Sequence, residues 1–155
     1  MPTQLSDVEA NAWVEWYDKL NTPQVAKIEL ALTRILRAIG ERREPSDVLI
    51  DSVIAWERLF GTREGEPTFR VTSCLAKLLK DNLDERLAFK ARLGKIYRLR
   101  SDIVHGNRVL ERDDFALCNE ALDVATQAIR VLLTDRQDIL KLTDGAQRGA
   151  ALLLG

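Results

Sequence analysis

Residues 82–106 read NLDERLAFKARLGKIYRLRSDIVHG, and this stretch decides the architecture of the chain. Asn82 followed by Glu85 is a typical helix start, and Gly106 is a typical helix stop. Between them, core-type positions recur in steps of four, three, four and three residues, at Phe89, Leu93, Ile96, Arg100 and Ile103. The stretch therefore predicts one long helix that packs a single face against the rest of the protein.

The apolar face of this helix is interrupted at position 100, where Arg100 stands in place of an apolar residue. A buried guanidinium is costly unless an acidic group or an anionic ligand pairs with it. Glu57, which lies in an apolar part of an upstream helix, is the candidate partner within the protein. The sequence leaves two interpretations open: a structural ion pair with Glu57, or a cationic group that binds an anionic ligand.

His105 is the single histidine of the chain and directly precedes Gly106. A lone histidine at a helix end is usually a capping or half-buried residue, but imidazole also suits general acid/base chemistry near neutral pH. On an ideal helix, Arg100 and His105 would lie about 140° apart. The position of His105 at the helix end relaxes this constraint, because a terminal residue can leave helical dihedral angles and the Arg side chain is long.

The rest of the chain also has helical spacing without the alternation typical of strands, so we predict an all-α bundle of about five or six helices. The other predicted helices run from Ser6 to near Asn21, from a Thr22 cap to Gly40, from a Ser46 cap to Gly61, from a Thr68 cap through Leu78, and from near Asp113 to Asp135. Two stripes are predicted to face the core: Val25, Ile28, Leu32, Ile35 and Ile39, and Phe115, Cys118, Leu122, Ala125, Ile129 and Leu132. Residues 61–67 are predicted to form a loop. The tail, 136–155, is expected to pack back or fray and is assigned no function.

Composition narrows the functional classes. The 155 residues suit a single domain, 1–155, and a net charge of −1 excludes a globally basic nucleic-acid binder. Two cysteines, Cys74 and Cys118, and one histidine cannot form a structural zinc site, so we expect buried, reduced thiols, no metal and no cofactor. The chain carries no GxGxxG, GxxxxGK[ST] or HExxH motif. Without a leader-like segment or a run of roughly 20 apolar residues, we expect a cytoplasmic protein that does not bind membranes.

The segment YRLRSDIVHG, residues 97–106, resembles the signature of HEPN domains, in which an Arg precedes a His by about four to six intervening residues. The upstream segments IAWERLFG, 54–61, and EPTFRVTSCLAKLL, 66–79, are most similar to the Apea-like branch of that family. In that branch, an "AxExLF" helix, a loop containing Gly and Glu, and another helix precede the Arg/His helix in the same order. The resemblance covers residues 46–134 well and the first two helices only in general architecture.

This resemblance implies a helical bundle that commonly dimerises with its Arg/His helices facing each other. Many members are metal-independent endoribonucleases, so the expected function is RNA cleavage by 2′-hydroxyl attack at a homodimer interface, in a toxin or defence system with an antitoxin as a further partner. Two alternatives stay open. The chain is either a non-catalytic HEPN module that binds RNA, a nucleotide or a protein partner, or a regulatory domain of a larger protein.

The resemblance assigns Arg100 as the phosphate clamp and His105 as the general acid/base. Ser101, Asp102 and Glu57 are supporting candidates. Asp102 has two interpretations, because it either orients the imidazole or forms an exposed helical ion pair with Arg98, and we favour the ion pair.

RNA-binding candidates follow from a local excess of positive charge. Between residues 86 and 112, the cationic side chains are Arg86, Lys90, Arg92, Lys95, Arg98, Arg100, Arg108 and Arg112, opposed by Asp102 and Glu111. Within this stretch, Arg98 and Arg108 are candidates for phosphate contacts, and Tyr97 either stacks on a base or packs in the core. Most of the other cations are expected to form a solvated helix face.

Overall fold

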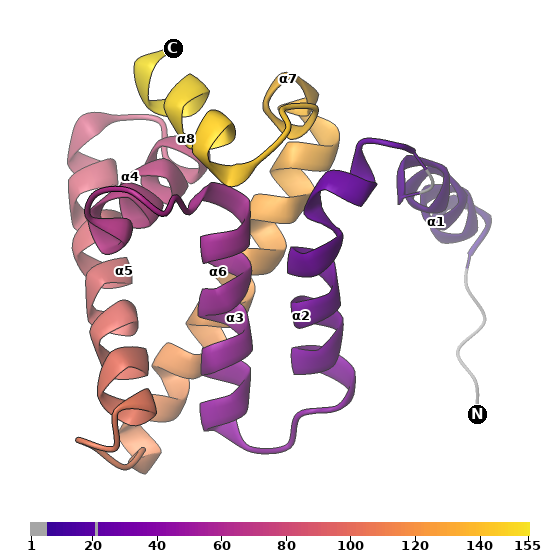
Figure 1. Cartoon of the computed structure of the whole chain (residues 1–155). Helices are drawn as coiled ribbons and strands as arrows, with labels where there is room; N and C mark the ends of the chain where they lie inside the picture. Colours follow the sequence, from indigo (N-terminus) through magenta and orange to yellow (C-terminus); the bar gives the residue numbers. More distant parts are fainter. Residues whose placement is uncertain (1–5, 21) are drawn as a thin grey trace.

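The computed structural model describes residues 6–20 and 22–155, which form helices joined by turns and loops (Figure 1). The helices are α1 (Asp7–Leu20), α2 (Glu29–Gly40), α3 (Pro45–Phe60), α4 (Pro67–Leu79), α5 (Leu83–Val104), α6 (Phe115–Thr134), α7 (Gln137–Leu140) and α8 (Gly145–Leu154). Short 3-10 turns, Val25–Ile28 and Arg112–Asp114, lead into α2 and α6. No strand occurs within these described ranges, so the predicted all-α class is confirmed. None of their helices is both long and apolar enough to cross a bilayer.

Helix α3 is the centre of the bundle. It packs against α2 and α6 along its length and against α8 near its C-terminal end, while α4 and α5 pair with each other beside it (Figure 1). The fully buried Trp56 joins α3 to α6, because its indole N–H donates to the carbonyl of Ala121 at 3.2 Å. Helix α3 therefore contacts most of the helices that cover the core.

Most predicted helix ends are confirmed to within a few residues. Asn82 caps α5 by accepting a hydrogen bond from the Glu85 N–H at 2.9 Å. In the capping box at Ser6, the backbone N–H of Ser6 donates to a Glu9 carboxylate oxygen at 2.8 Å. Helices α3 and α4 begin earlier than the predicted Ser46 and Thr68 caps, because Pro45 and Pro67 occupy first-turn positions that need no N–H donor. The predicted end of α1 near Asn21 lies outside the described residues.

The predicted stripe of α2 is wrong at its C-terminal end. Ile39 is 62% exposed, whereas Ala31 and Ala38 are buried together with Ile28 and Ile35. The helix does not start at Thr22 as expected. A 3-10 turn precedes it, and Ile28 leaves helical geometry with φ −117 and ψ 15 before α2 begins. Buried residues lie on both sides of this break, Ile28 before it and Ala31, Ile35 and Ala38 after it, in steps of three, four and three residues. The buried face of α2 therefore runs through Ala38, and Ile39 lies beside that face.

The predicted stripe of α6 is wrong at its first residue. Phe115 lies at the N-terminal end of α6 and is exposed, while Cys118, Ala125, Ile129 and Leu132 are buried as predicted. Phe115 lines a surface hollow together with Pro45 at the start of α3 and Ile103 near the end of α5, so its ring is only partly covered.

The C-terminal tail belongs to the core. Helix α8 packs on α3 and α4 and buries Leu152. Arg148 of α8 is only 1% exposed, and its guanidinium donates to the carbonyls of Leu59 at 2.8 Å, Arg58 at 2.9 Å and Leu142 at 3.2 Å. The last carbonyls of a helix have no partner within it, so Arg148 caps the C-terminal end of α3.

We expect Arg148→Ala to lower the free energy of unfolding by on the order of 3 kcal/mol, because it leaves buried carbonyls without donors. The exposed Arg130 on α6 provides a control, and Arg130→Ala should change the free energy by less than about 0.5 kcal/mol. Urea denaturation followed by circular dichroism measures both values. Equal, small effects would show that the guanidinium does not stabilise the end of α3.

Both thiols should be unreactive in the native protein. Burial raises the pKa of Cys74 and that of Cys118 from 9.0 to about 11, so little thiolate forms at pH 8. We expect alkylation at pH 8 to be at least about a hundredfold slower in native protein than in urea. The unfolded chain ionises first, so stability should fall as the pH rises from 9 to 11. Similar labelling rates in both states would contradict the burial of the thiols.

Candidate functional site

Helix α5 directs Arg100 towards α3. Arg100 follows the buried Ile96 and Leu99 on the face that packs into the bundle, and its side chain is 22% exposed. Its Nη2 lies 3.5 Å from Oε2 of Glu57 on α3, and the Glu57 side chain is 31% exposed. The ion pair suggested by the sequence is therefore present, at a partly solvated boundary between the two helices.

This ion pair leaves much of the guanidinium unused. A distance of 3.5 Å exceeds the 2.7–3.2 Å of an N–H···O hydrogen bond, so the contact is a charge pairing. Among the described residues, none accepts a hydrogen bond from the buried Nε of Arg100. An Arg side chain carries five N–H donors; Nε of Arg100 is buried, and the partly exposed remainder of the guanidinium is what an anion such as a phosphodiester could reach.

Tyr97 completes a three-residue cluster with Glu57 and Arg100. Its hydroxyl donates to Oε1 of Glu57, and the residue is 7% exposed. Burial, with the hydrogen bond to Glu57 as the next cause, raises the pKa of Tyr97 well above its ordinary value. The predicted stacking of Tyr97 on a base is therefore not supported, because its ring is buried; the packing alternative is the one observed.

The end of α5 determines where His105 lies. Gly106 has φ +72, and its N–H donates to the Ile103 carbonyl at 3.1 Å, while the Asn107 N–H donates to the Asp102 carbonyl at 2.9 Å. These bonds form a Schellman motif, which requires the left-handed conformation that glycine adopts without strain. His105 is consequently the C-cap residue, and its side chain is exposed.

Arg100 and His105 leave α5 on different sides. His105 has φ −83 and ψ 0, so its backbone departs only moderately from the helix and the offset of about 140° between the two residues largely remains. Arg100 points into the α3–α5 boundary, whereas His105 faces solvent. The relaxation of the helix end does not bring the two groups to one point within a single chain.

The remaining candidates are Ser101 and Asp102, predicted to support the site, and Arg98 and Arg108, predicted to contact RNA. Ser101 and Asp102 are half-buried, and the Ser101 carbonyl accepts the His105 N–H at 3.0 Å. The favoured Arg98–Asp102 pair is wrong, since no ion pair joins these two described residues, and Arg98 is exposed. Arg108 pairs with Asp114 at 2.6 Å, so its guanidinium already has an acidic partner within the protein.

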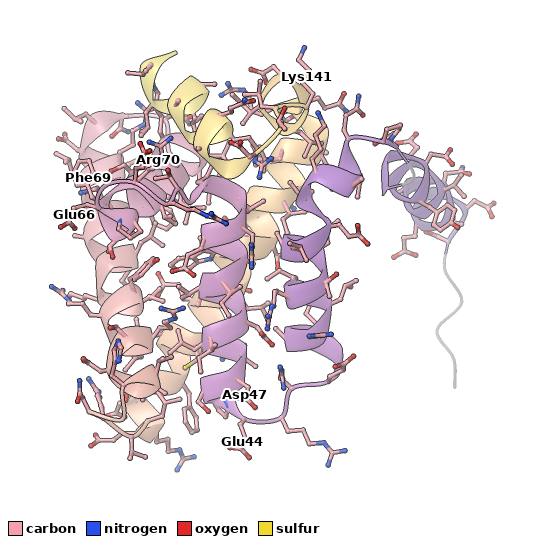
Figure 2. The ribbon with its side chains drawn as sticks, viewed as in Figure 1. Glu44, Asp47, Glu66, Phe69, Arg70 and Lys141 are labelled. Carbon is pink, nitrogen blue, oxygen red and sulfur yellow. The ribbon has the colours of Figure 1, made fainter. Side chains whose placement is uncertain are left out.

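A surface hollow that the sequence did not predict lies at the C-terminal end of α5, next to Gly106. Its volume is about 440 Å³, and its lining includes Ile103, Gly106, Leu110, Phe115 and Glu44. Figure 2 shows Glu44 at the N-terminal end of α3, at the same end of the bundle as the C-terminus of α5. In the sequence, the hollow could have been anticipated from the apolar residues Val109 and Leu110, which follow His105 closely and line it.

A larger hollow of about 1210 Å³ lies between α2, α3 and the start of α8, and Glu57 is part of its wall. Its charged lining mixes both signs, and Arg34 there already pairs with Asp51 at 2.9 Å. We place the candidate site at α5, because its cation has unused donors and its histidine is accessible. The described residues include no group of three or more His, Cys, Asp or Glu side chains arranged to hold a metal.

Gly94 within α5 and Gly106 just after it should respond to alanine in opposite directions. Gly106→Ala should destabilise the protein by about 1 kcal/mol, because φ +72 is unfavourable for alanine. Gly94→Ala should stabilise it by up to about 1 kcal/mol, because a Cβ there meets nothing within 4 Å in a helix interior. Thermal unfolding of both variants checks the signs. A neutral Gly106→Ala would show that the Schellman motif does not fix the position of His105.

Comparison of the chain with protein-family models, with curated proteins and with solved structures finds no match. The chemistry of Arg100, Glu57, Tyr97 and His105 is therefore the basis on which a function can be proposed.

Proposed function

We propose that the chain is a metal-independent endoribonuclease of the HEPN type that acts as a homodimer. The observation that supports this proposal most is the environment of Arg100. Its guanidinium occupies a core-facing position of α5, keeps unused donors, and precedes an exposed His105 at the helix end. A cation with free donors and an imidazole are groups that metal-free RNA cleavage requires, and because the two leave α5 on different sides, the proposed site draws them from two chains.

In this reaction the 2′-hydroxyl of RNA attacks the adjacent phosphorus. One His105 takes the proton of the 2′-hydroxyl as general base, and Arg100 binds the phosphate oxygens on which negative charge increases. The bond to the 5′-oxygen breaks, and a second imidazole donates a proton to the leaving oxygen. The products are a 2′,3′-cyclic phosphate and a 5′-hydroxyl.

A homodimer supplies the second imidazole. Each chain has one histidine, and a two-fold axis near the end of α5 would place two His105 and two Arg100 side chains around one cleft. The exposed apolar residues Val104, Val109 and Phe115 surround this helix end and provide a surface for such an interface.

The positive charge of α5 supports RNA as the substrate. Fewer of its cationic side chains are free to bind RNA than the sequence suggests, because some have partners within the protein. Arg92 pairs with Glu120 at 2.8 Å, and Lys90 lies 4.0 Å from the ring centre of Phe69. Arg98 and Lys95 are exposed on the same helix, closer to the site. They are the cations that we propose for backbone contacts along the RNA.

One observation favours the alternative, a non-catalytic module that binds RNA, a nucleotide or a protein partner. Glu57 already balances the charge of Arg100, so Arg100 also fits a structural role at the α3–α5 boundary. Both the enzyme and the binding module are compatible with a place in a toxin or defence system with an antitoxin partner, or within a larger protein.

Incubation of the protein with single-stranded RNA in EDTA tests the proposal. We expect cleavage that leaves 2′,3′-cyclic phosphate ends, with losses of at least about a hundredfold in Arg100→Ala and His105→Ala and none in the control Arg130→Ala. Circular dichroism and light scattering confirm fold and dimer for each variant. RNA binding without cleavage by folded wild type would favour the binding module, and unchanged cleavage in either variant would reject the assigned roles.

A further inference from the structure

We propose that Tyr97 is a positioning residue that keeps the Glu57 carboxylate from closing on Arg100, so that the guanidinium stays available for an RNA phosphodiester. This inference rests on the function proposed above. It concerns a residue that contacts no RNA in the scheme, because Tyr97 is buried and acts through Glu57.

The cluster is built by two helices. Tyr97 and Arg100 are three residues apart on α5 and therefore lie on the same face, where both reach Glu57 of α3. The two carboxylate oxygens have separate neighbours, since Oε1 accepts the Tyr97 hydroxyl and Oε2 faces Arg100 Nη2 at 3.5 Å. One end of the carboxylate is thus held while the other stays beyond hydrogen-bond distance.

Without the hydrogen bond from Tyr97, a different arrangement of Glu57 and Arg100 would be favoured. A carboxylate and a guanidinium prefer two parallel N–H···O bonds at about 2.7–2.9 Å, which would use both oxygens of Glu57. Arg100 has a buried Nε without an acceptor among the described residues, so an additional acceptor would be favourable there. The same two-pronged geometry binds a phosphodiester. Because Nε is buried, RNA can reach only the Nη groups, and Nη2 is also the group that Glu57 faces, so the carboxylate and RNA compete for it.

Two properties suit Tyr97 to this role. The ring is packed in the core at 7% exposure, so its hydroxyl has little freedom to follow a moving carboxylate. Burial and the neighbouring Glu57 raise the pKa of Tyr97, so the hydroxyl remains a donor throughout the pH range in which histidine titrates. The donor is therefore fixed in both position and protonation state.

The test begins with Tyr97→Phe, which removes the hydroxyl and keeps the ring. We expect the KM for RNA to rise about tenfold with little change in kcat, because the freed Glu57 occupies Arg100. The double variant Tyr97→Phe/Glu57→Gln should return KM to within about twofold of wild type, since a neutral amide does not compete for the guanidinium. Tyr17→Phe, at an exposed tyrosine of α1, is the matched control and should change nothing.

A binding measurement separates this inference from the proposed function. Fluorescence anisotropy with a labelled 2′-O-methyl RNA reports Kd without cleavage, because this RNA has no nucleophilic 2′-hydroxyl. If wild type does not cleave RNA but Kd follows the same pattern of loss and rescue, the nuclease proposal fails and the role of Tyr97 stands. Unchanged KM and Kd in Tyr97→Phe, or a loss that Glu57→Gln does not reverse in a folded protein, would overturn the positioning role.

Discussion

The contact between Glu57 and Arg100 is the constraint on which the site depends. A guanidinium at a core-facing helix position requires an acidic neighbour, and Glu57 meets that need from the central helix. The two groups remain at 3.5 Å because the other oxygen of Glu57 is bonded to Tyr97. The pair thus makes the burial of Arg100 tolerable without using up its hydrogen-bonding capacity.

Helix α3 can hold Glu57 in place because it is itself fixed from several sides. Arg148 caps its C-terminal carbonyls, and Trp56 joins it to α6. Near its N-terminal half, the buried Asp51 accepts hydrogen bonds from Arg34 at 2.9 Å and Arg42 at 2.8 Å, which tie α2 and the following loop to α3. These polar contacts link segments distant in sequence and limit movement of the helix that carries Glu57.

Much of the candidate site could be predicted because its signals are local. The cap at Asn82 and the stop at Gly106 depend on residues within one helical turn, so the sequence predicts the length of α5 and the place of His105. Arg100 stands out because it interrupts an apolar stripe. The exposure of Ile39 on α2 could not be predicted in the same way, because Ala38 and Ile39 are both apolar and only the packing of α2 decides which of the two is buried.

The sequence by itself determined the all-α class, the end of the long helix and the need of Arg100 for a partner, since helix propensity, capping and the cost of a buried charge act within short segments. Only the tertiary structure decided that the tail caps α3 through Arg148, that Tyr97 bonds Glu57, and that Arg98 and Asp102 remain apart. In each case the question is which side chains form a hydrogen bond or an ion pair with each other. The answer depends on which side chains the packed helices bring within about 3 Å of each other, and spacing along the chain does not encode that distance.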